Sequence, residues 1–304
     1  MEKRLLVVGS INIDLVACAS RLPAPGETIL GSSFDVFNGG KGANQAVGIA
    51  KLGAQVDMIA SLGTDLFTER LLSGLKDAGV DTRAVQIVPG PCGVAHISRA
   101  DNGENSIIVI SGANHEVSAA YIESHLEIVQ HAAMILVQLE TPLEAVTYLA
   151  QQAWQAKIPL MLDPAPAMTL PEALLGRTTW LTPNETEAQI LLGGASIDPA
   201  TAAEKLLAMG ARNVALKLGP QGVFLAGRDC SAQRIPSFKV DAVDTTAAGD
   251  CFNAAFAVAL TRGDAPAIAA RYAAAAAAIS VTRVGAQPSL PSAAEVDAFL
   301  AHAS

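Results

Sequence analysis

The sequence predicts an α/β protein in three layers, with a mostly parallel central sheet between helices and a second, small sheet standing apart. Two observations predict this fold. Short buried-strand patterns alternate with helical patterns along most of the chain, which is typical of a parallel sheet covered on both faces. Residues 28–37 and 93–110 differ, because they are rich in strand-forming residues, and Asn102-Gly103 is a hairpin signal. We expect these two stretches to form the small sheet.

The elements of the main body follow in order along the chain. Strands are expected at 5–8, 56–60, 134–137, 160–162, 180–181 and 213–218. Helices are expected near 41–52, 64–78, 118–130, 142–156, 184–192, 199–209, 247–261 and 265–281, with a last helix from Ser292. The six consecutive alanines at 273–278 predict a helix packed closely against a neighbour. Since such sheets bind ligands at the carboxyl ends of their strands, residues that follow the strands are candidates for function.

Composition excludes several classes of protein. The 304 residues are 51% hydrophobic and 16% charged, which fills a sizeable core and argues against disorder. A net charge of −9 argues against a nucleic-acid partner, and no apolar stretch is long enough to predict a membrane span. The N-terminal apolar run is too short for a signal peptide. The four cysteines form no CxxC pair, so we expect free thiols and a cytoplasmic location.

The strongest local signal is the segment 243–253, in which small residues lead into a helix. Ala247, Ala248 and Gly249 leave the backbone open to a ligand at a helix start, where N–H groups lack partners. This turn is therefore a candidate anion cradle. Asp250 follows in the first turn and could take a proton from an attacking hydroxyl. The alternative is that Asp250 only caps the helix.

A glycine-rich turn at 38–46 precedes another expected helix. It is not a phosphate-binding P-loop, because Gly42 follows Lys41 where that motif needs Ser or Thr. The ordinary interpretation is a tight strand-to-helix junction. Lys41 and Asn44 inside the turn favour ligand binding instead.

Asn12 and Asp14 lie just past the first strand, two residues apart, and could project to one side. A carboxylate and an amide suit the adjacent hydroxyls of a polyol. The alternative is an ordinary polar loop.

Two further segments are candidates for a nucleotide and its metal. Asn184 and Glu187 begin an expected helix and could hold hydrated Mg²⁺, or could form a helix cap. The stretch 217–222 follows a strand and reads as a tight turn that could skirt a nucleotide.

Taken together, these motifs resemble the ribokinase branch of the PfkB carbohydrate-kinase family. The resemblance runs from Gly9 to Ser289. It rests on motifs in the family's order: GSINID, GGKGANQA, QLE, PAPA, TPNETEA, LGPQG, DTTAAGD and GAQPS. Asp163, before PAPA, departs from the family's asparagine, and Ala273–Ala278 replaces polar residues that the family often places near adenine.

The resemblance implies one kinase domain over residues 1–304, with a β-lid from about 13–38 and 93–112 that often forms a homodimer interface. It implies ATP-dependent phosphorylation of the 5-hydroxyl of ribose. Deoxyribose, another small sugar or a nucleoside stays open as the substrate, and a catalytically silent sugar-binding regulator is the alternative from another class.

The resemblance also assigns roles to individual residues. Asp250 is the general base, and Ala247, Ala248 and Gly249 form the anion hole. The sugar is surrounded by Asn12, Asp14, Gly39, Gly40, Lys41, Asn44, Glu140 and Asp250. ATP and Mg²⁺ are served by Asn184, Glu187, Lys217, Gly219, Gly222, Ala248 and Gly249. A K⁺ site is implied at Asp244, Thr246, Ser280, Arg283, Gly285 and Ser289, whereas a plain Asp244–Arg283 ion pair is the alternative.

Overall fold

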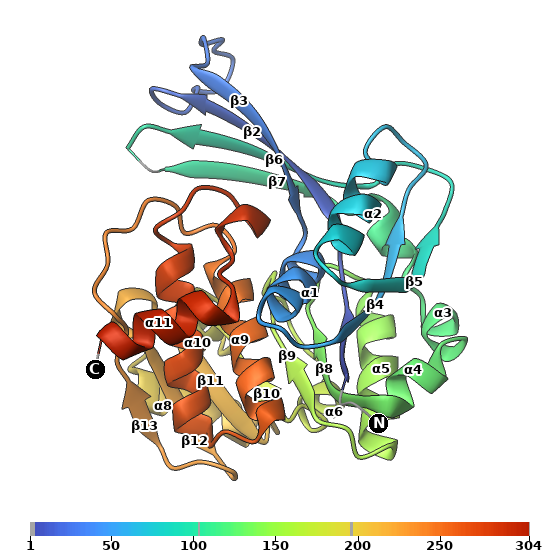
Figure 1. Ribbon diagram of the computed structural model, residues 1–304, viewed down its shortest axis with the longest axis vertical. Helices are drawn as coiled ribbons and strands as arrows, with labels where there is room; N and C mark the ends of the chain where they lie inside the picture. Colours follow the sequence, from blue (N-terminus) through green and yellow to red (C-terminus); the bar gives the residue numbers. More distant parts are fainter. Residues whose placement is uncertain (1–3, 103, 195–196, 304) are drawn as a thin grey trace.

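Two sheets of unequal size organise the chain in the computed structural model, which describes residues 4–102, 104–194 and 197–303. A nine-stranded sheet forms the body, and a four-stranded sheet projects from one end of it (Figure 1). The order of the large sheet is β13-β12-β11-β10-β9-β8-β1-β4-β5. Its strands are β1 (Arg4–Val8), β4 (Val56–Leu62), β5 (Asp81–Ile87), β8 (Ala132–Val137), β9 (Leu160–Leu162), β10 (Trp180–Leu181), β11 (Asn213–Lys217), β12 (Val223–Gly227) and β13 (Gln233–Ile235).

The strands from β5 to β11 pair in parallel, and only β12 and β13 are antiparallel additions at one edge. This confirms the predicted mostly parallel sheet. The alternation of side chains along β1 shows why both faces are covered. Leu5 and Val7 enter one hydrophobic cluster, while Leu6 and Val8 enter the other. The strands β5, β12 and β13 were not predicted from the sequence.

Helices cover both faces of the large sheet and complete three layers. One layer contains α1 (Lys41–Lys51), α2 (Thr68–Asp77), α9 (Ala248–Arg262), α10 (Pro266–Ser280) and α11 (Ala293–His302). The other contains α3 (Ala119–Glu123), α4 (Leu126–His131), α5 (Leu143–Gln155), α6 (Glu172–Leu175), α7 (Glu185–Leu191) and α8 (Pro199–Ala208). Short 3₁₀ turns lie at η1 (Gly112–Glu116), η2 (Gly219–Gln221) and η3 (Gln287–Ser289). The prediction of a single helix at 118–130 is wrong, because a turn at Ser124 and His125 separates α3 from α4.

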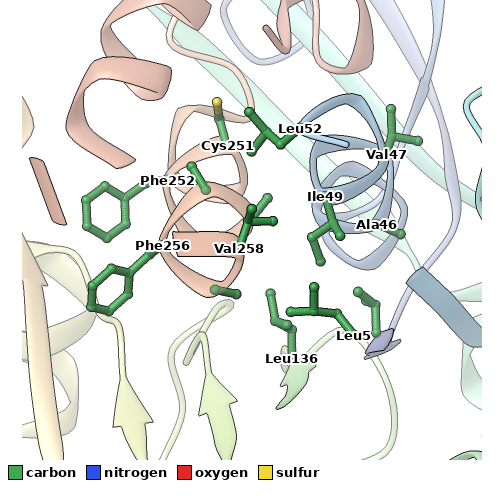
Figure 2. Close-up of a cluster of buried hydrophobic side chains, with 14 of the residues drawn as sticks. Leu5, Ala46, Val47, Ile49, Leu52, Leu136, Cys251, Phe252, Phe256 and Val258 are labelled. Carbon is green, nitrogen blue, oxygen red and sulfur yellow. The ribbon is translucent and has the colours of Figure 1, made fainter. Parts of the chain in front are cut away.

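The helix α9 lies at the centre of its layer and is packed from several sides. Figure 2 shows Phe252 and Phe256 of α9 on one side of it, with Ile49 of α1 facing it from the other. Phe256 also meets Trp180 edge-on, with 4.9 Å between ring centroids. Interiors of this density leave little room for displacement. The first turn of α9 is therefore held firmly against the ends of the strands.

The small sheet has the order β3-β2-β6-β7, formed by β2 (Asn12–Ala19), β3 (Ser33–Gly39), β6 (Gly93–Ala100) and β7 (Asn105–Ile110). The expected strand at 28–37 is displaced, since β3 begins at Ser33. β6 and β7 form an antiparallel pair that ends at Arg99 and Asn105, next to the connecting turn. Gly103 of the expected hairpin signal lies outside the described residues. β2 lies where a polar loop was an open alternative, and its first residue pairs with both Gly39 and Gly93.

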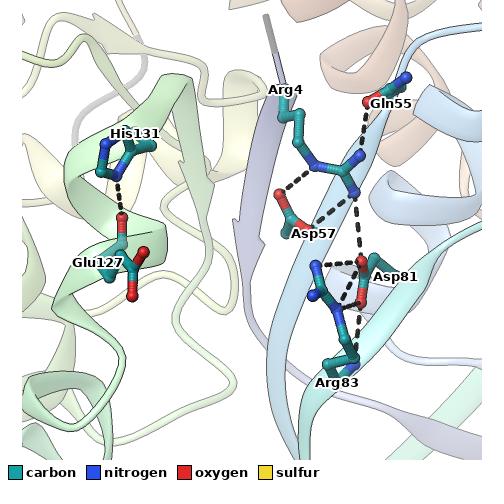
Figure 3. A network of polar contacts seen from close by, with 7 residues as sticks. All are labelled: Arg4, Gln55, Asp57, Asp81, Arg83, Glu127 and His131. Atoms are coloured by element: carbon teal, nitrogen blue, oxygen red, sulfur yellow. Dashed lines mark hydrogen bonds and ion pairs between the residues drawn. The ribbon is translucent and has the colours of Figure 1, made fainter. Parts of the chain in front are cut away.

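At the opposite end of the body, the N-terminal ends of β1, β4 and β5 carry a network of ion pairs (Figure 3). Arg4 donates to both oxygens of Asp57, at 2.7 and 2.8 Å, and Arg83 contacts Asp81 at 2.8 Å. Arg4 also reaches Asp81 at 3.5 Å, which joins the three strands. In the described part of the chain, no helix has the length and apolarity needed to cross a membrane.

Candidate active site

A cavity of about 900 Å³ lies between the C-terminal ends of the central strands and the small sheet. Its walls come from β2, the start of α1, the loops after β8 and β9, and the start of α9. The predicted site residues that line it are Asn12, Asp14, Gly40, Lys41, Asn44, Glu140, Glu187, Asp244, Thr246, Ala247, Asp250 and Gly285. The structure therefore brings segments from all parts of the chain to one space, where ligands bind in open parallel sheets.

Asp250 is buried in the first turn of α9 and faces α1. Its carboxylate accepts hydrogen bonds from Asn44 Nδ2 at 2.9 Å and from Gln45 Nε2 at 3.1 Å. No side-chain hydrogen bond caps α9, so the interpretation of Asp250 as a simple cap is wrong. Burial raises the pKa of Asp250 to about 6, against the opposing charge of Lys41. The carboxylate can therefore exchange a proton near neutral pH.

The turn before Asp250 has an unusual backbone. Ala247 adopts a left-handed conformation at φ 59°, which non-glycine residues rarely occupy. Such a residue at a helix start turns successive N–H groups toward one concave surface. The N–H of Ala248 already donates to Thr245 O at 3.2 Å, which leaves the N–H groups of Ala247 and Gly249 as donors for an anion. A Cβ placed on Gly249 would lie 3.4 Å from Lys217 Nζ, so this ammonium group stands beside the turn.

Asn12 and Asp14 point from β2 into the cavity, because residues two apart share one face of a strand. Both side chains are buried. Burial, followed by the charges of Glu140 and Asp250, raises the pKa of Asp14 to about 7, although Lys41 opposes this. A Cβ at Gly39 would overlap the Asp14 carboxylate, and Gly40 has a positive φ of 89°. These two glycines are thus needed where they stand.

Glu140 joins the first loop to the start of α1. It accepts hydrogen bonds from Ser10 Oγ at 2.5 Å and from the N–H of Lys41 at 3.2 Å, and Asn12 Nδ2 lies at 3.5 Å. Lys41 is itself surrounded by carboxylates. Burial lowers its pKa, but the charges of Asp250, Asp163 and Glu140 outweigh burial and the pKa of Lys41 is raised. Its ammonium group is therefore a permanent positive charge in the cavity.

The residues expected to serve the nucleotide and Mg²⁺ are only partly assembled. Asn184 and Glu187 form a reciprocal capping box at α7, with three hydrogen bonds of 2.8 Å between them. Only Glu187 lines the cavity, and burial raises the pKa of its carboxyl group. Lys217 pairs with Asp163 at 3.0 Å, while Gly219 and Gly222 lie in the following turn and do not line this cavity. Within the described ranges, no group of His, Cys, Asp and Glu side chains is arranged to hold a metal ion.

The residues of the expected K⁺ site come from two adjoining segments. The N–H groups of Val243 and Asp244 both donate to Val281 O, and the N–H of Gly285 donates to Asp244 Oδ2 at 3.0 Å. Thr246 donates to the other carboxylate oxygen of Asp244.

The alternative Asp244–Arg283 ion pair is wrong. Asp244 is paired with Arg99 of β6 at 3.4 Å, and Arg283 reaches Glu295 at 2.6 Å. Ser280 and Ser289 are buried, with hydroxyl groups that donate to Ala277 O and Ala286 O. Arg283 could therefore serve a cation only through its main chain.

Several residues that line the cavity or hold its lining side chains were not singled out from the sequence. Asn114 of η1 donates to Asn12 Oδ1 at 2.7 Å, and Gln138 donates to Gln45 Oε1 at 2.6 Å. Gln45 and Gln138 lie inside the motifs GGKGANQA and QLE, which was an available signal. Asp163 was noted only as a departure, and Arg99 had no signal in the sequence.

The family model for pfkB carbohydrate kinases matches residues 2–293. The chain belongs to the pfkB family of carbohydrate kinases. The ribokinase of Bacillus subtilis (strain 168) is 42% identical over 300 residues, covering 98% of this chain and 99% of that protein. The deoxyribokinase of Salmonella typhi is 35% identical over 302 residues, covering 97% and 98%. The structure of Arabidopsis thaliana ribokinase complexed with ribose and ATP superposes with a TM-score of 0.91 at 35% identity, covering 99% of both chains. Membership of this family makes the chain a kinase that phosphorylates an alcohol group of a carbohydrate.

Proposed function

We propose that this carbohydrate kinase transfers the γ-phosphoryl group of ATP to the 5-hydroxyl of D-ribose, giving ribose 5-phosphate and ADP. The observation that carries the proposal is the position of Asp250. Its buried carboxylate faces the same cavity as Asn12 and Asp14, directly after the left-handed turn at Ala247. Similarity over nearly the full chain to ribokinases, one of them solved with ribose and ATP, supports the substrates.

In this proposal, polar groups of the cavity hold the sugar. The Asp14 carboxylate accepts hydrogen bonds from adjacent hydroxyls of the sugar, and the Asn12 amide can both accept and donate. Glu140 and Asn44 provide further hydrogen-bond partners. The Gly39-Gly40 backbone lets Asp14 approach without obstruction. Losing such partners in a closed cavity leaves hydroxyls unpaired, which is how a site discriminates between sugars.

Asp250 acts as the general base toward the attacking hydroxyl. A carboxylate with a pKa of about 6 is largely ionised at neutral pH and still basic enough to accept a proton. Phosphoryl transfer otherwise needs positioning and neutralisation of charge. The first-turn N–H groups of α9, together with Lys41 and Lys217, supply these.

ATP is placed against the start of α9 and the turn after β11, where Lys217, Gly219 and Gly222 lie. Mg²⁺ fits the Glu187 side of the cavity, because this carboxylate is anchored by Asn184 and keeps further lone pairs for metal-bound water. Bound there, Mg²⁺ would neutralise phosphate charge.

K⁺ is proposed between the segments 243–246 and 280–285, which the Asp244 carboxylate joins by accepting hydrogen bonds from the N–H groups of Thr246 and Gly285. The proposed residues are Asp244, Thr246, Ser280, Arg283, Gly285 and Ser289. Such an ion would stiffen the turn that carries Ala247.

The small sheet is proposed as a lid over the sugar and as a homodimer interface. Every residue of β7 is exposed, including the consecutive apolar residues 107–110. Exposed apolar strands at a sheet edge are typical of pairing surfaces. The whole chain is proposed as one kinase domain, with this lid formed by about 13–38 and 93–112.

A second candidate is phosphorylation of 2-deoxyribose, favoured by the similarity to a deoxyribokinase. A panel of ribose, 2-deoxyribose, other small sugars and nucleosides, assayed with ATP and Mg²⁺, separates the two. We expect kcat/KM to be at least roughly tenfold higher for ribose than for 2-deoxyribose, because a missing hydroxyl leaves buried partners unpaired. A preference for 2-deoxyribose or a nucleoside would overturn ribose as the substrate. ATP turnover that is independent of every sugar would contradict the kinase mechanism.

A further inference from the structure

One amide nitrogen bridges two buried carboxylates at the end of the cavity. Gln45 Nε2 donates to Asp250 Oδ1 at 3.1 Å and to Asp163 Oδ2 at 3.2 Å. The orientation of this amide is fixed, because Gln45 Oε1 accepts from Gln138 Nε2 at 2.6 Å. All four side chains are at most 5% exposed. The charges of Asp163 and Asp250 are therefore linked through a single group that solvent does not screen.

The second oxygen of Asp163 is also occupied. Asp163 Oδ1 accepts from Lys217 Nζ at 3.0 Å, and this ammonium group stands beside Gly249 in the anion turn. An ionised carboxylate only accepts hydrogen bonds, so it satisfies both donors. An asparagine at 163 would face one of them with its own amide donors.

We infer that Asp163 is a positioning residue that acts through Gln45 to set the proton affinity of Asp250. The inference rests on the proposed function, in which Asp250 accepts the proton of the sugar hydroxyl. A negative charge one amide away disfavours ionisation of Asp250 and so makes it a stronger base. Lys217 limits this effect, since it lies against Asp163 and neutralises part of its charge.

Other groups face Asp250 and act with Asp163 or against it. Burial is the largest cause of the raised pKa of Asp250, Lys41 of α1 lowers it, and Asp163 raises it. The amides of Asn44 and Gln45 lower it by donating hydrogen bonds. Asp14 of β2 and Cys251 of α9 also interact electrostatically with Asp250, and Lys217 stands beside the adjacent Gly249. Asp163 thus opposes the effect of Lys41 on the pKa of Asp250. It keeps this pKa near the pH at which the base works.

The first experiment measures kcat for ribose phosphorylation against pH in the wild type and in Asp163→Asn. We expect the acid-side midpoint to fall by roughly 0.5–1 pH unit in the variant. The plateau should fall by roughly 2–10-fold, since a weaker base accepts the proton less readily. The ionisation of ATP affects the pH profiles of both proteins equally. The difference between the two midpoints therefore comes from groups of the protein. Asp163→Glu keeps the charge and should leave the midpoint near that of the wild type.

Asp229→Asn is the matched control. Asp229 likewise accepts hydrogen bonds from a cation and an amide, Arg212 and Asn213, but lies in the turn after β12. Its variant should have the wild-type pH profile. An unmoved midpoint in Asp163→Asn, or an equal shift in Asp229→Asn, would overturn the inference.

A second measurement needs no turnover. Carbon-13 NMR titration of aspartate carboxyl groups, with Asp250 assigned by its loss in Asp250→Asn, should show a lower midpoint for Asp250 in Asp163→Asn. Lys217→Gln removes the neutralising cation and should raise the midpoint, which keeps the test decisive if Asp163→Asn fails to fold. An Asp250 midpoint that moves in neither variant refutes the inference. If the midpoints move but ribose is not phosphorylated, the electrostatic link stands and the proposed substrate fails.

Discussion

The two ends of the central sheet treat carboxylates in opposite ways. At the N-terminal ends of the strands, Asp57 and Asp81 each lie against a guanidinium group, at 2.7 and 2.8 Å (Figure 3). At the C-terminal ends, more carboxylates than cations gather around the cavity. The carboxylates that line it are Asp14, Glu140, Glu187, Asp244 and Asp250, and the cations are Lys41 and Arg99; the Asp163–Lys217 pair lies next to Asp250.

The protonation of the two groups differs accordingly. The hydrogen bond from Arg83 lowers the pKa of Asp81, whereas burial raises the pKa of Asp14 to about 7 and that of Asp250 to about 6. One end of the sheet thus stabilises the fold with matched charges. The other maintains carboxyl groups that exchange protons at neutral pH, a property that proton transfer needs and stability does not.

The largest effect is expected from Asp250→Asn, which should lower kcat by roughly 10²–10⁴-fold because the base is lost. Ribose binding should change little, since the amide oxygen can still accept from one of the two donors, Asn44 or Gln45, and the change adds no bulk. Steady-state kinetics and calorimetric titration with ribose measure the two effects. Asp57→Asn, the corresponding change at the opposite end, should leave kcat near that of the wild type. Near-normal kcat in Asp250→Asn would show that the ends do not differ in this way.

Asp14→Ala should weaken ribose binding far more than ATP binding. The loss leaves sugar hydroxyls unpaired in a buried cavity, at roughly 1–3 kcal/mol each, or about 5–150-fold in Kd. Separate calorimetric titrations with ribose and with ATP measure both affinities. Asp81→Ala serves as the control and should alter neither. Equal losses for the two ligands in Asp14→Ala would indicate a general disturbance of the fold.

Activation by K⁺ should separate two aspartates that both pair with arginine. Initial rates in KCl, NaCl and a bulky ammonium salt at matched ionic strength should be several-fold higher with K⁺. Asp244→Ala should lose this response, because its carboxylate joins the segments 243–246 and 280–285. Asp57→Ala should keep it. Identical rates in all three salts would remove the proposed cation site while leaving the kinase assignment intact.

The smallest effects concern stability against pH. The pKa of Asp14 is raised in the folded state. Its contribution to the stability of the fold is therefore fully present below the ordinary pKa of 3.8 and is lost as pH rises through about 7. Asp14→Asn cannot ionise, so relative to the wild type it should gain roughly 1–3 kcal/mol between pH 5 and pH 8. Thermal unfolding at pH 5, 6.5 and 8 measures this difference.

Asp81→Asn should change the stability at neutral pH in the opposite direction to Asp14→Asn. A lowered pKa contributes stability above the unfolded value of 3.8 and loses it as pH falls through the folded pKa. The variant should therefore be less stable at pH 5–8, by only ~0.2–1 kcal/mol because the pair is near solvent. A gain in stability at pH 8 in both variants would contradict the comparison.

The sequence predicted six of the nine strands of the large sheet, because each of these strands has its own local pattern. β2 was harder to predict, although Asn12-Ile13-Asp14-Leu15 alternates as a strand does, because polar residues after a turn also suit a loop. Contacts between distant residues had no such local signal. Gln45 meets Asp163 across 118 positions and Asp250 across 205, and Asp244 pairs with Arg99 rather than with the nearer Arg283. The sequence therefore indicated which residues are candidates for function, from their residue types. The contacts between these residues could be identified only from the structure.

The alanine run of α10 has a consequence for how the gene can vary. Ala273, Ala275 and Ala276 are fully buried, and α10 packs along the helix that carries Asp250. Methyl groups set the spacing between these two helices, so a larger side chain would force α9 and α10 apart. A saturation library should therefore be depleted of bulky substitutions along this inert stretch. In such a library, selection for the proposed role of Asp250 would act on residues that have no chemistry of their own.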